Sequence, residues 1–209
     1  MKRFMVLVLV FGLLFGISTV SLGYGIFEAT DLMTTPTANT LRQGVLGVAA
    51  NFAEGNSFFL NCDFGLIQDL EVGVSVFNYP GDTYVSLRGK LRIIREDTNT
   101  PALAVGIQDL GKNGTISPYL TISKSFSDVG IRGYIGVGGG NFDGIFGGLS
   151  KEFITSGKGS HLRALELFLE ADSHNMNVGA KFAIGPQAKI NFGLVDMKDW
   201  ILGATFLVK

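Results

Sequence analysis

The sequence is poor in charge, cysteine and histidine, and each shortage excludes a class of function. Charged residues make up 17% of the 209 residues, below the roughly 25% that is usual in soluble domains. Lys and Arg number 17 against 18 Asp and Glu, so the chain offers no basic surface for nucleic acid. One Cys and two His exclude an internal disulfide framework and a Cys/His zinc site. We therefore expect no metal site and no cofactor.

Glycine and apolar residues are abundant instead. The chain contains 29 Gly, roughly twice the usual share, and 46% hydrophobic residues. Its mean hydropathy is +0.33. High hydrophobic content with a net charge near zero excludes a disordered chain. The composition is that of an ordered, apolar and weakly charged fold.

The first 23 residues have the pattern of an export signal. A basic pair is followed by an uncharged, mostly apolar run over 4–20. Ser21 and Gly23 then provide small residues for signal-peptidase cleavage before Tyr24. An uncleaved anchor is the alternative, although no basic flank follows the apolar run. The sequence thus predicts an exported protein with a signal peptide at 1–23.

From about residue 44 onward, apolar and polar residues alternate with period two. Val85, Leu87 and Leu91, for example, alternate with Ser86 and Lys90. This period places each set on one face of a strand, and Gly- and Pro-containing turns separate the runs. We expect about twelve antiparallel strands, within a range of ten to fourteen. The predicted strands are 44–53, 57–66, 70–78, 83–95, 101–109, 117–126, 129–138, 143–153, 162–172, 175–184, 187–195 and 198–208.

The polar faces of these strands decide between two all-β architectures. They are rich in Gly, Ser, Asn and Thr, a poor outer coat for a soluble β-sandwich. A closed meander of about twelve strands is also too wide for side chains to fill its interior. If the apolar faces meet lipid and the polar faces line the lumen, both difficulties disappear. We therefore predict an up-and-down transmembrane β-barrel over 44–209, with a soluble periplasmic β-sandwich that binds lipid or sugar as the alternative.

Charged side chains that share a face with small polar residues are expected inside this barrel, where they could pair or set an ionic preference. Aromatic residues near strand ends are expected to form girdles at the membrane surfaces. The candidate lumen charges are Arg88, Lys90, Arg92, Glu166, Glu170 and Lys181. The candidate girdle residues are Tyr79, Tyr84, Phe126, Phe153 and Trp200.

Two further segments allow more than one interpretation. Residues 24–43 are irregular; they could fold into the lumen as a plug, but we favour a lead-in that carries the chain to the first strand. His174 beside Asp172, or His161, could form a catalytic site at the rim that acts on lipid or peptide. We favour two turn histidines and no enzyme activity, because the chain has no Gly-x-Ser-x-Gly elbow. The final strand, with Gly203, is a candidate for recognition by the outer-membrane assembly machinery through strand pairing.

Residues 25–53 and 100–126 carry motifs similar to those of a known family. They are Gly25-Ile26-Phe27, Met33-Thr34-Thr35-Pro36-Thr37-Ala38 with Gly44, Pro101 to Gly111 around Gln108-Asp109, and Tyr119 to Phe126. Together they resemble the YjbH-type outer-membrane proteins. The resemblance implies a β-barrel in the outer membrane of a diderm bacterium, associated with exopolysaccharide or envelope work. Expected partners are outer-membrane lipid and polysaccharide or small solutes, and the expected role is structural or that of a narrow pore.

Overall fold

The computed structural model describes residues 29–209 except 112–114, 127, 155–161 and 173. The predicted signal peptide and His161 lie outside the described residues. Within the described part, no helix is long and apolar enough to cross a membrane. The chain forms twelve strands in sequence order: β1 Leu46–Ala53, β2 Ser57–Ile67, β3 Leu70–Tyr79, β4 Asp82–Ile94, β5 Ala102–Leu110, β6 Ser117–Phe126, β7 Ile131–Gly138, β8 Gly144–Ile154, β9 Leu162–Ala171, β10 Met176–Ile184, β11 Ala188–Val195 and β12 Asp199–Val208.

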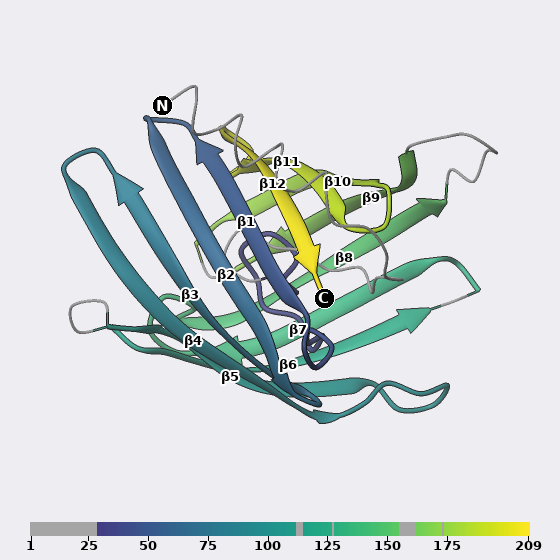
Figure 1. The fold of residues 1–209 in the computed structure, drawn as a ribbon. Helices are drawn as coiled ribbons and strands as arrows, with labels where there is room; N and C mark the ends of the chain where they lie inside the picture. The colour runs from purple at the N-terminus through teal and green to yellow at the C-terminus, as the bar shows by residue number, and fades with distance from the viewer. Residues whose placement is uncertain (1–28, 112–114, 127, 155–161, 173) are drawn as a thin grey trace.

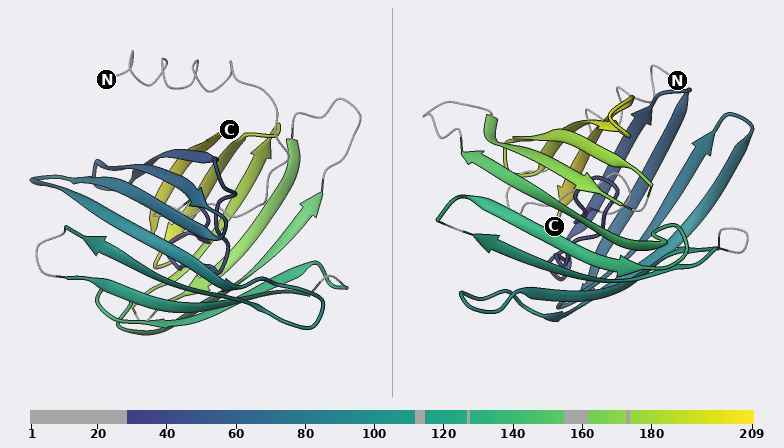
Figure 2. Two further views of the ribbon diagram at one scale, coloured as in Figure 1. Left: turned by 60° about the horizontal axis from the view of Figure 1, so that its bottom comes forward. Right: turned by 180° about the vertical axis from the view of Figure 1, so that it is seen from behind.

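The strands form one closed barrel in which every neighbour is antiparallel. The last strand returns to the first, with β1 and β12 in register from Leu46↔Val208 to Ala53↔Ile201. Figures 1 and 2 show the resulting ring of tilted strands. Closure pairs the edge strands that a sandwich would leave open. The predicted barrel is therefore confirmed and the β-sandwich alternative is wrong.

An even number of strands brings the start of β1 and the end of β12 to the same end of the barrel. We call this the terminal end; it also carries the β2–β3, β4–β5, β6–β7 and β10–β11 turns. The opposite end, called the far end, carries the β1–β2, β3–β4, β7–β8 and β11–β12 turns.

The apolar set of each strand faces outward. On β4, Val85 and Leu87 are 48% and 52% exposed, whereas Arg88 and Lys90 are 6% and 1% exposed. Leu167 on β9 is likewise exposed. Such a continuous apolar outer surface is what a bilayer requires and a soluble barrel would not tolerate.

The aromatic prediction is only partly right. Phe126 and Phe153 are exposed near the terminal end of β6 and β8. Tyr79 and Tyr84 instead line a cavity inside the barrel, so their assignment to a membrane girdle is wrong. The pleat explains the difference, because both have the parity of the inward-facing Phe77 and Ser86 rather than that of the lipid-facing set.

Residues 29–41 lie inside the barrel, as the purple segment enclosed by strands in Figures 1 and 2 shows. We call this segment the plug. Most of its residues are fully buried, among them Asp31, Leu32 and Ala38 at 1% exposure or less. The favoured interpretation of a simple lead-in is wrong for these residues; the plug alternative is what the structure shows. The reason is that wall side chains satisfy the plug backbone, as described next.

Candidate functional site

A carboxylate on β9 anchors the tip of the plug. Glu170, which is fully buried, accepts hydrogen bonds from the backbone N–H groups of Met33 at 2.9 Å, Thr34 at 2.8 Å and Thr35 at 3.3 Å. The hydroxyls of Thr34 and Thr35 and the amide of Asn177 donate to the same carboxylate. Consecutive N–H groups around one oxyanion form an anion-binding nest. Here the nest belongs to the plug tip, and the oxyanion is the Glu170 carboxylate of the wall.

A lysine pair holds the start of the plug. The Lys90 ammonium on β4 lies 2.9 Å from the Asp31 carboxylate and also donates to the Thr30 hydroxyl at 2.8 Å. From the other side of the barrel, Lys181 on β10 donates to the Asp31 carbonyl oxygen at 3.1 Å. Asp31 is thus clamped between opposite walls. Because all these charges are buried, removing one partner would leave an uncompensated charge, which is strongly destabilising.

Asp63 on β2 links the plug to a cation of the wall. It accepts from the Ala29 N–H at 2.9 Å and forms an ion pair with Arg88 at 2.5 Å. Asp63 and Arg88 occupy one row across β2, β3 and β4, with Gly73 between them. A Cβ at Gly73 would collide with both side chains, so the missing side chain leaves the space in which the pair meets.

Glu71 on β3 and two hydroxyl side chains on β6 hold the remainder of the plug. The Glu71 carboxylate accepts from the Thr30 hydroxyl at 3.1 Å and from the Leu41 N–H at 2.6 Å. On β6, the Thr121 hydroxyl donates to the Pro36 carbonyl and the Ser123 hydroxyl accepts from the Ala38 N–H. Ala38 packs on Ala102 and Ala104 of β5, and all three are buried. The Pro-Thr-Ala motif is therefore a docking motif between plug and wall.

The candidate lumen charges differ in what they contact. Arg88, Lys90, Glu170 and Lys181 are buried and engage the plug or its partners, as described above. Glu166 is also buried and lies 3.9 Å from Lys181. Arg92 lies apart from the plug, at the terminal end, where it pairs with Asp69 at 2.5 Å. Their role in ionic preference stays a prediction.

The Gln-Asp motif forms a β-bulge on β5. The pairing with β4 shifts in register between Leu87 and Gly89, and Asp109 has a positive φ of 61°. As a result both Gln108 and Asp109 are buried inside the barrel, whereas regular alternation would send one of them outward.

The two bulge side chains reach in different directions. Gln108 donates toward the Asp31 carboxylate of the plug at 3.5 Å. Asp109 accepts from the Ser117 hydroxyl at 2.6 Å and from the Asn141 amide at 2.7 Å, which ties the β7–β8 turn to the wall. The bulge therefore places one side chain against the plug and the next against the turn at the far-end rim.

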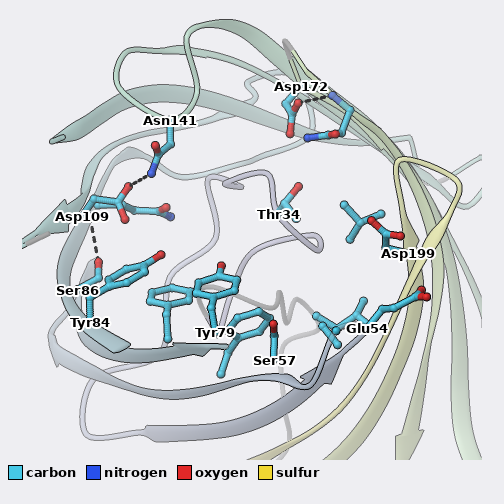
Figure 3. A pocket seen from close by; sticks show the side chains of 18 of the residues that line it. Thr34, Glu54, Ser57, Tyr79, Tyr84, Ser86, Asp109, Asn141, Asp172 and Asp199 are labelled. Atoms are coloured by element: carbon cyan, nitrogen blue, oxygen red, sulfur yellow. Dashed lines mark hydrogen bonds between the residues drawn. The ribbon is translucent and has the colours of Figure 1, made fainter. Parts of the chain in front are cut away.

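A cavity of about 710 Å³ lies between the plug and the far end; we call it the far-end cavity. Thr34 of the plug reaches it, and aromatic rings from β2, β3 and β4 cover one side, as Figure 3 shows for Tyr79 and Tyr84. Carboxylates and amides from the rim cover the other sides. Its lining side chains include Glu54, Ser57, Phe59, Phe77, Tyr79, Tyr84, Ser86, Arg88, Gln108, Asp109, Asn141, Phe142, Asp172, Asn175, Lys198, Asp199 and Trp200.

A second cavity, of about 560 Å³, lies at the terminal end, and its lining includes four basic and two acidic side chains. Asn39 of the plug reaches this one. At its edge the guanidinium groups of Arg95 and Arg92 donate hydrogen bonds to Asp69 and hold the pKa of that carboxyl below its usual value. The lining residues are Asn39, Arg92, Arg95, Glu96, Asp97, Thr98, Ala102, Lys124, Ser125 and Arg132.

His174, the histidine considered for a catalytic site at the rim, lies in a turn beside Asp172. The Asp172 carboxylate accepts from the backbone N–H groups of His174 and Asn175 at 2.7 Å, which is the geometry of a turn cap. The described part of the chain contains no cluster of three or more His, Cys, Asp and Glu side chains that could hold a metal ion. Asp172 thus caps the turn that contains His174.

The motifs that dock the plug and form the bulge both lie within a match to a known family. A family model described as exopolysaccharide biosynthesis protein YbjH matches residues 24–173, which includes both motifs. The chain belongs to this YjbH family. No curated protein matches the sequence.

Solved structures support the fold of this YjbH-family barrel. A KdgM porin superposes with a TM-score of 0.57 at 11% identity, covering 78% of this chain and 98% of the porin. A KdgM porin in complex with disordered oligogalacturonate gives 0.56 at 10% identity, with the same coverage. The Acinetobacter baumannii outer membrane protein Omp33 gives 0.48 at 7% identity, covering 79% and 97%. The two KdgM superpositions show that the YjbH-family chain has the fold of this porin.

Several residues of the site were not predicted as such. Asp63 and Glu71 have the inward parity of Asn61 and Ser75, so strand periodicity could have identified them. The same strand alternation also predicts that the Tyr79 and Tyr84 side chains face the lumen. Asp31 offered no signal, because the irregular plug has no period.

Proposed function

We propose that this barrel is a narrow passage of the outer membrane whose own N-terminal segment controls access, and that it serves exopolysaccharide handling in the envelope. The observation that carries this proposal is the plug, which lies in the lumen between a cavity at each end. Family membership supports the exopolysaccharide connection. The KdgM complex supports it further, since that porin of similar fold is described with an oligogalacturonate.

The mode of attachment suggests how the passage opens. The plug is held by hydrogen bonds and ion pairs to the wall rather than by strand pairing. These contacts are separate from the pairing between neighbouring strands, so their loss would release the plug while the twelve-stranded wall stays closed. We expect lipid around the barrel and the assembly machinery at β12 as further partners, and a transport or structural role without catalysis.

Conductance in planar bilayers tests this function. The native chain should show little or no current. Glu170→Gln removes the charge that the nest of N–H groups binds, and we expect plug release to rise at least about tenfold, with stepwise ohmic current. Glu152→Gln, a lumen-facing change on β8 that is half-buried, is the matched control and should behave as the native chain does. Equal currents from all three proteins would contradict control by the plug.

A further inference from the structure

The far-end cavity has an aromatic wall whose base packs against the plug, because Phe59 and Phe77 share one buried cluster with Leu32 and Met33. The ring centroids of Phe77 and Tyr84 lie 4.9 Å apart in a stacked pair, and those of Tyr79 and Tyr84 lie 6.1 Å apart. Phe59 supports this group from β2, 5.4 Å from Tyr79. Phe59 and Phe77 are buried, whereas Tyr79 is 36% exposed. The two tyrosines therefore present aromatic surface to the cavity from a rigid, packed base.

Hydrogen-bonding groups surround this aromatic wall. Figure 3 shows Asn141, Asp172 and Asp199 around the cavity, with Glu54 beside Ser57. An aromatic surface flanked by carboxylates, amides and hydroxyls is suited to a ligand that has apolar faces and a rim of hydroxyls. Sugar rings have this form, since their C–H groups pack on the negative face of an aromatic ring while their hydroxyls need polar partners. The volume, about 710 Å³, lies within the range of ligand sites.

The charges of the lining narrow the class of saccharide. The carboxylates are Glu54, Asp109, Asp172 and Asp199, and the cations are Arg88 and Lys198. Arg88 is already paired with Asp63 at 2.5 Å. Lys198 is therefore the cation that is left to offset the four carboxylates of the lining. A saccharide that carries carboxylates of its own would thus meet repulsion.

We propose that the far-end cavity binds a short saccharide without carboxylates, neutral or bearing amino groups, with its rings against Tyr79 and Tyr84. Glu54 and Asp199, both exposed at the rim, receive the hydroxyl or ammonium groups. This proposal rests on the carbohydrate role proposed above and adds the position of the site and the charge of its ligand. It distinguishes this chain from the porin described with oligogalacturonate, whose ligand is acidic.

Binding of three hexasaccharides to the full chain in detergent at pH 6 tests the site: a glucosamine oligomer, a neutral glucose oligomer and a galacturonate oligomer. We expect the glucosamine oligomer to bind most tightly and the galacturonate oligomer least. The double substitution Tyr79→Ala with Tyr84→Ala should weaken the first two at least about tenfold. Phe126→Ala, which removes a ring from the lipid face, should leave all three affinities unchanged. Unaltered binding by the tyrosine variant, or tightest binding of galacturonate, would overturn the proposal.

The carboxylates are tested separately, so that a folding defect cannot be mistaken for a lost site. Glu54→Gln with Asp199→Asn keeps the shape of both exposed side chains and removes their charge. Affinity for the glucosamine oligomer should fall about tenfold, and affinity for galacturonate should rise. No change in either would contradict the assigned role of these groups.

Failure of the saccharide site can be distinguished from failure of the proposed plugged passage. If none of the oligomers binds the native chain while Glu170→Gln still conducts, the saccharide site is wrong and the plugged passage stands. If binding follows the expected order while Glu170→Gln stays silent, the site stands and the passage is wrong.

Discussion

Single carboxylates decide where the plug lies. Glu170 and Glu166 belong to the same inward face of β9, yet only Glu170 receives the consecutive N–H groups of the plug tip. Glu166 has instead the ammonium of Lys181 at 3.9 Å. A buried charge is tolerated only with partners of this kind. The wall charges therefore define a docking surface for residues 29–41, which makes them unavailable as the lining of an open channel while the plug is in place.

At the terminal end, Asp69 provides a prediction about pH. Hydrogen bonds from Arg95, and then from Arg92, lower the pKa of Asp69 in the folded protein. A lowered pKa means that the interaction contributes stability above the pKa of the unfolded chain, about 3.9, and that this stability is lost as the pH falls through the folded value. Asp69→Asn should therefore lower the midpoint of thermal unfolding at pH 7, and its effect should shrink as the pH falls from about 3.9 toward the lower pKa of the folded protein.

Heat-dependent gel mobility after incubation at each pH measures that midpoint. Asp128→Asn, which changes an exposed carboxylate at the same end, should give the same small difference at pH 7 and at pH 3. A constant difference between Asp69→Asn and the native protein from pH 7 to pH 3 would show that the pairing with Arg95 does not stabilise the turn. The effect should be modest, since the Arg95 side chain is 52% exposed.

Among the elements, the strands could be predicted from the sequence and the plug could not. The predicted run 83–95 corresponds to β4 Asp82–Ile94, and 117–126 to β6 Ser117–Phe126, because alternation is a local property of the chain. The plug depends on partners far away in sequence: Thr34 binds Glu170 and Ala38 binds Ser123. No local period encodes such contacts. The inward direction of Lys90 was predictable, whereas its partner Asp31 was not.

The exit of the plug past β2 depends on a close approach at Gly65. The Gly65 N–H donates to the Val45 carbonyl, and the Gly44 N–H donates to the Gly65 carbonyl, at 3.0 and 2.8 Å. A Cβ at Gly65 would collide with the backbone carbonyl of Arg42, which cannot move without displacing the segment. Gly65→Ala should therefore destabilise the protein by about 1–3 kcal/mol and increase the conductance of the barrel.

Gly89→Ala is the control for this change. It lies on β4, and its nearest neighbour would be the Glu71 carbonyl oxygen at 3.9 Å, an ordinary contact. The free energy of unfolding in detergent and the bilayer current should both match the native values. If Gly65→Ala also matched them, the path of the chain from plug to β1 would not depend on this contact.

At the scale of the whole molecule, the barrel combines an apolar exterior with a polar, filled interior. The exterior carries exposed residues such as Leu87 and Leu120, while Ser86 and Thr121 on the same strands are buried. The lumen differs from that of a soluble barrel in being filled by the chain's own plug, whose Asp31 and Thr35 are buried among polar wall groups. This distribution requires a membrane around the wall and allows water at the two ends.

The orientation of the wall predicts how a charge on its outer face depends on depth. Leu87 lies midway along β4, whereas Ile94 is the last residue of that strand, and both are exposed at 52% and 40%. An arginine costs about 2–4 kcal/mol at the bilayer midplane and about 0–1 kcal/mol near the interface. In lipid vesicles, Leu87→Arg should therefore lower the free energy of unfolding by about 2–4 kcal/mol, and Ile94→Arg by no more than about 1 kcal/mol. Equal, small effects of both substitutions would mean that water, rather than hydrocarbon, surrounds the barrel.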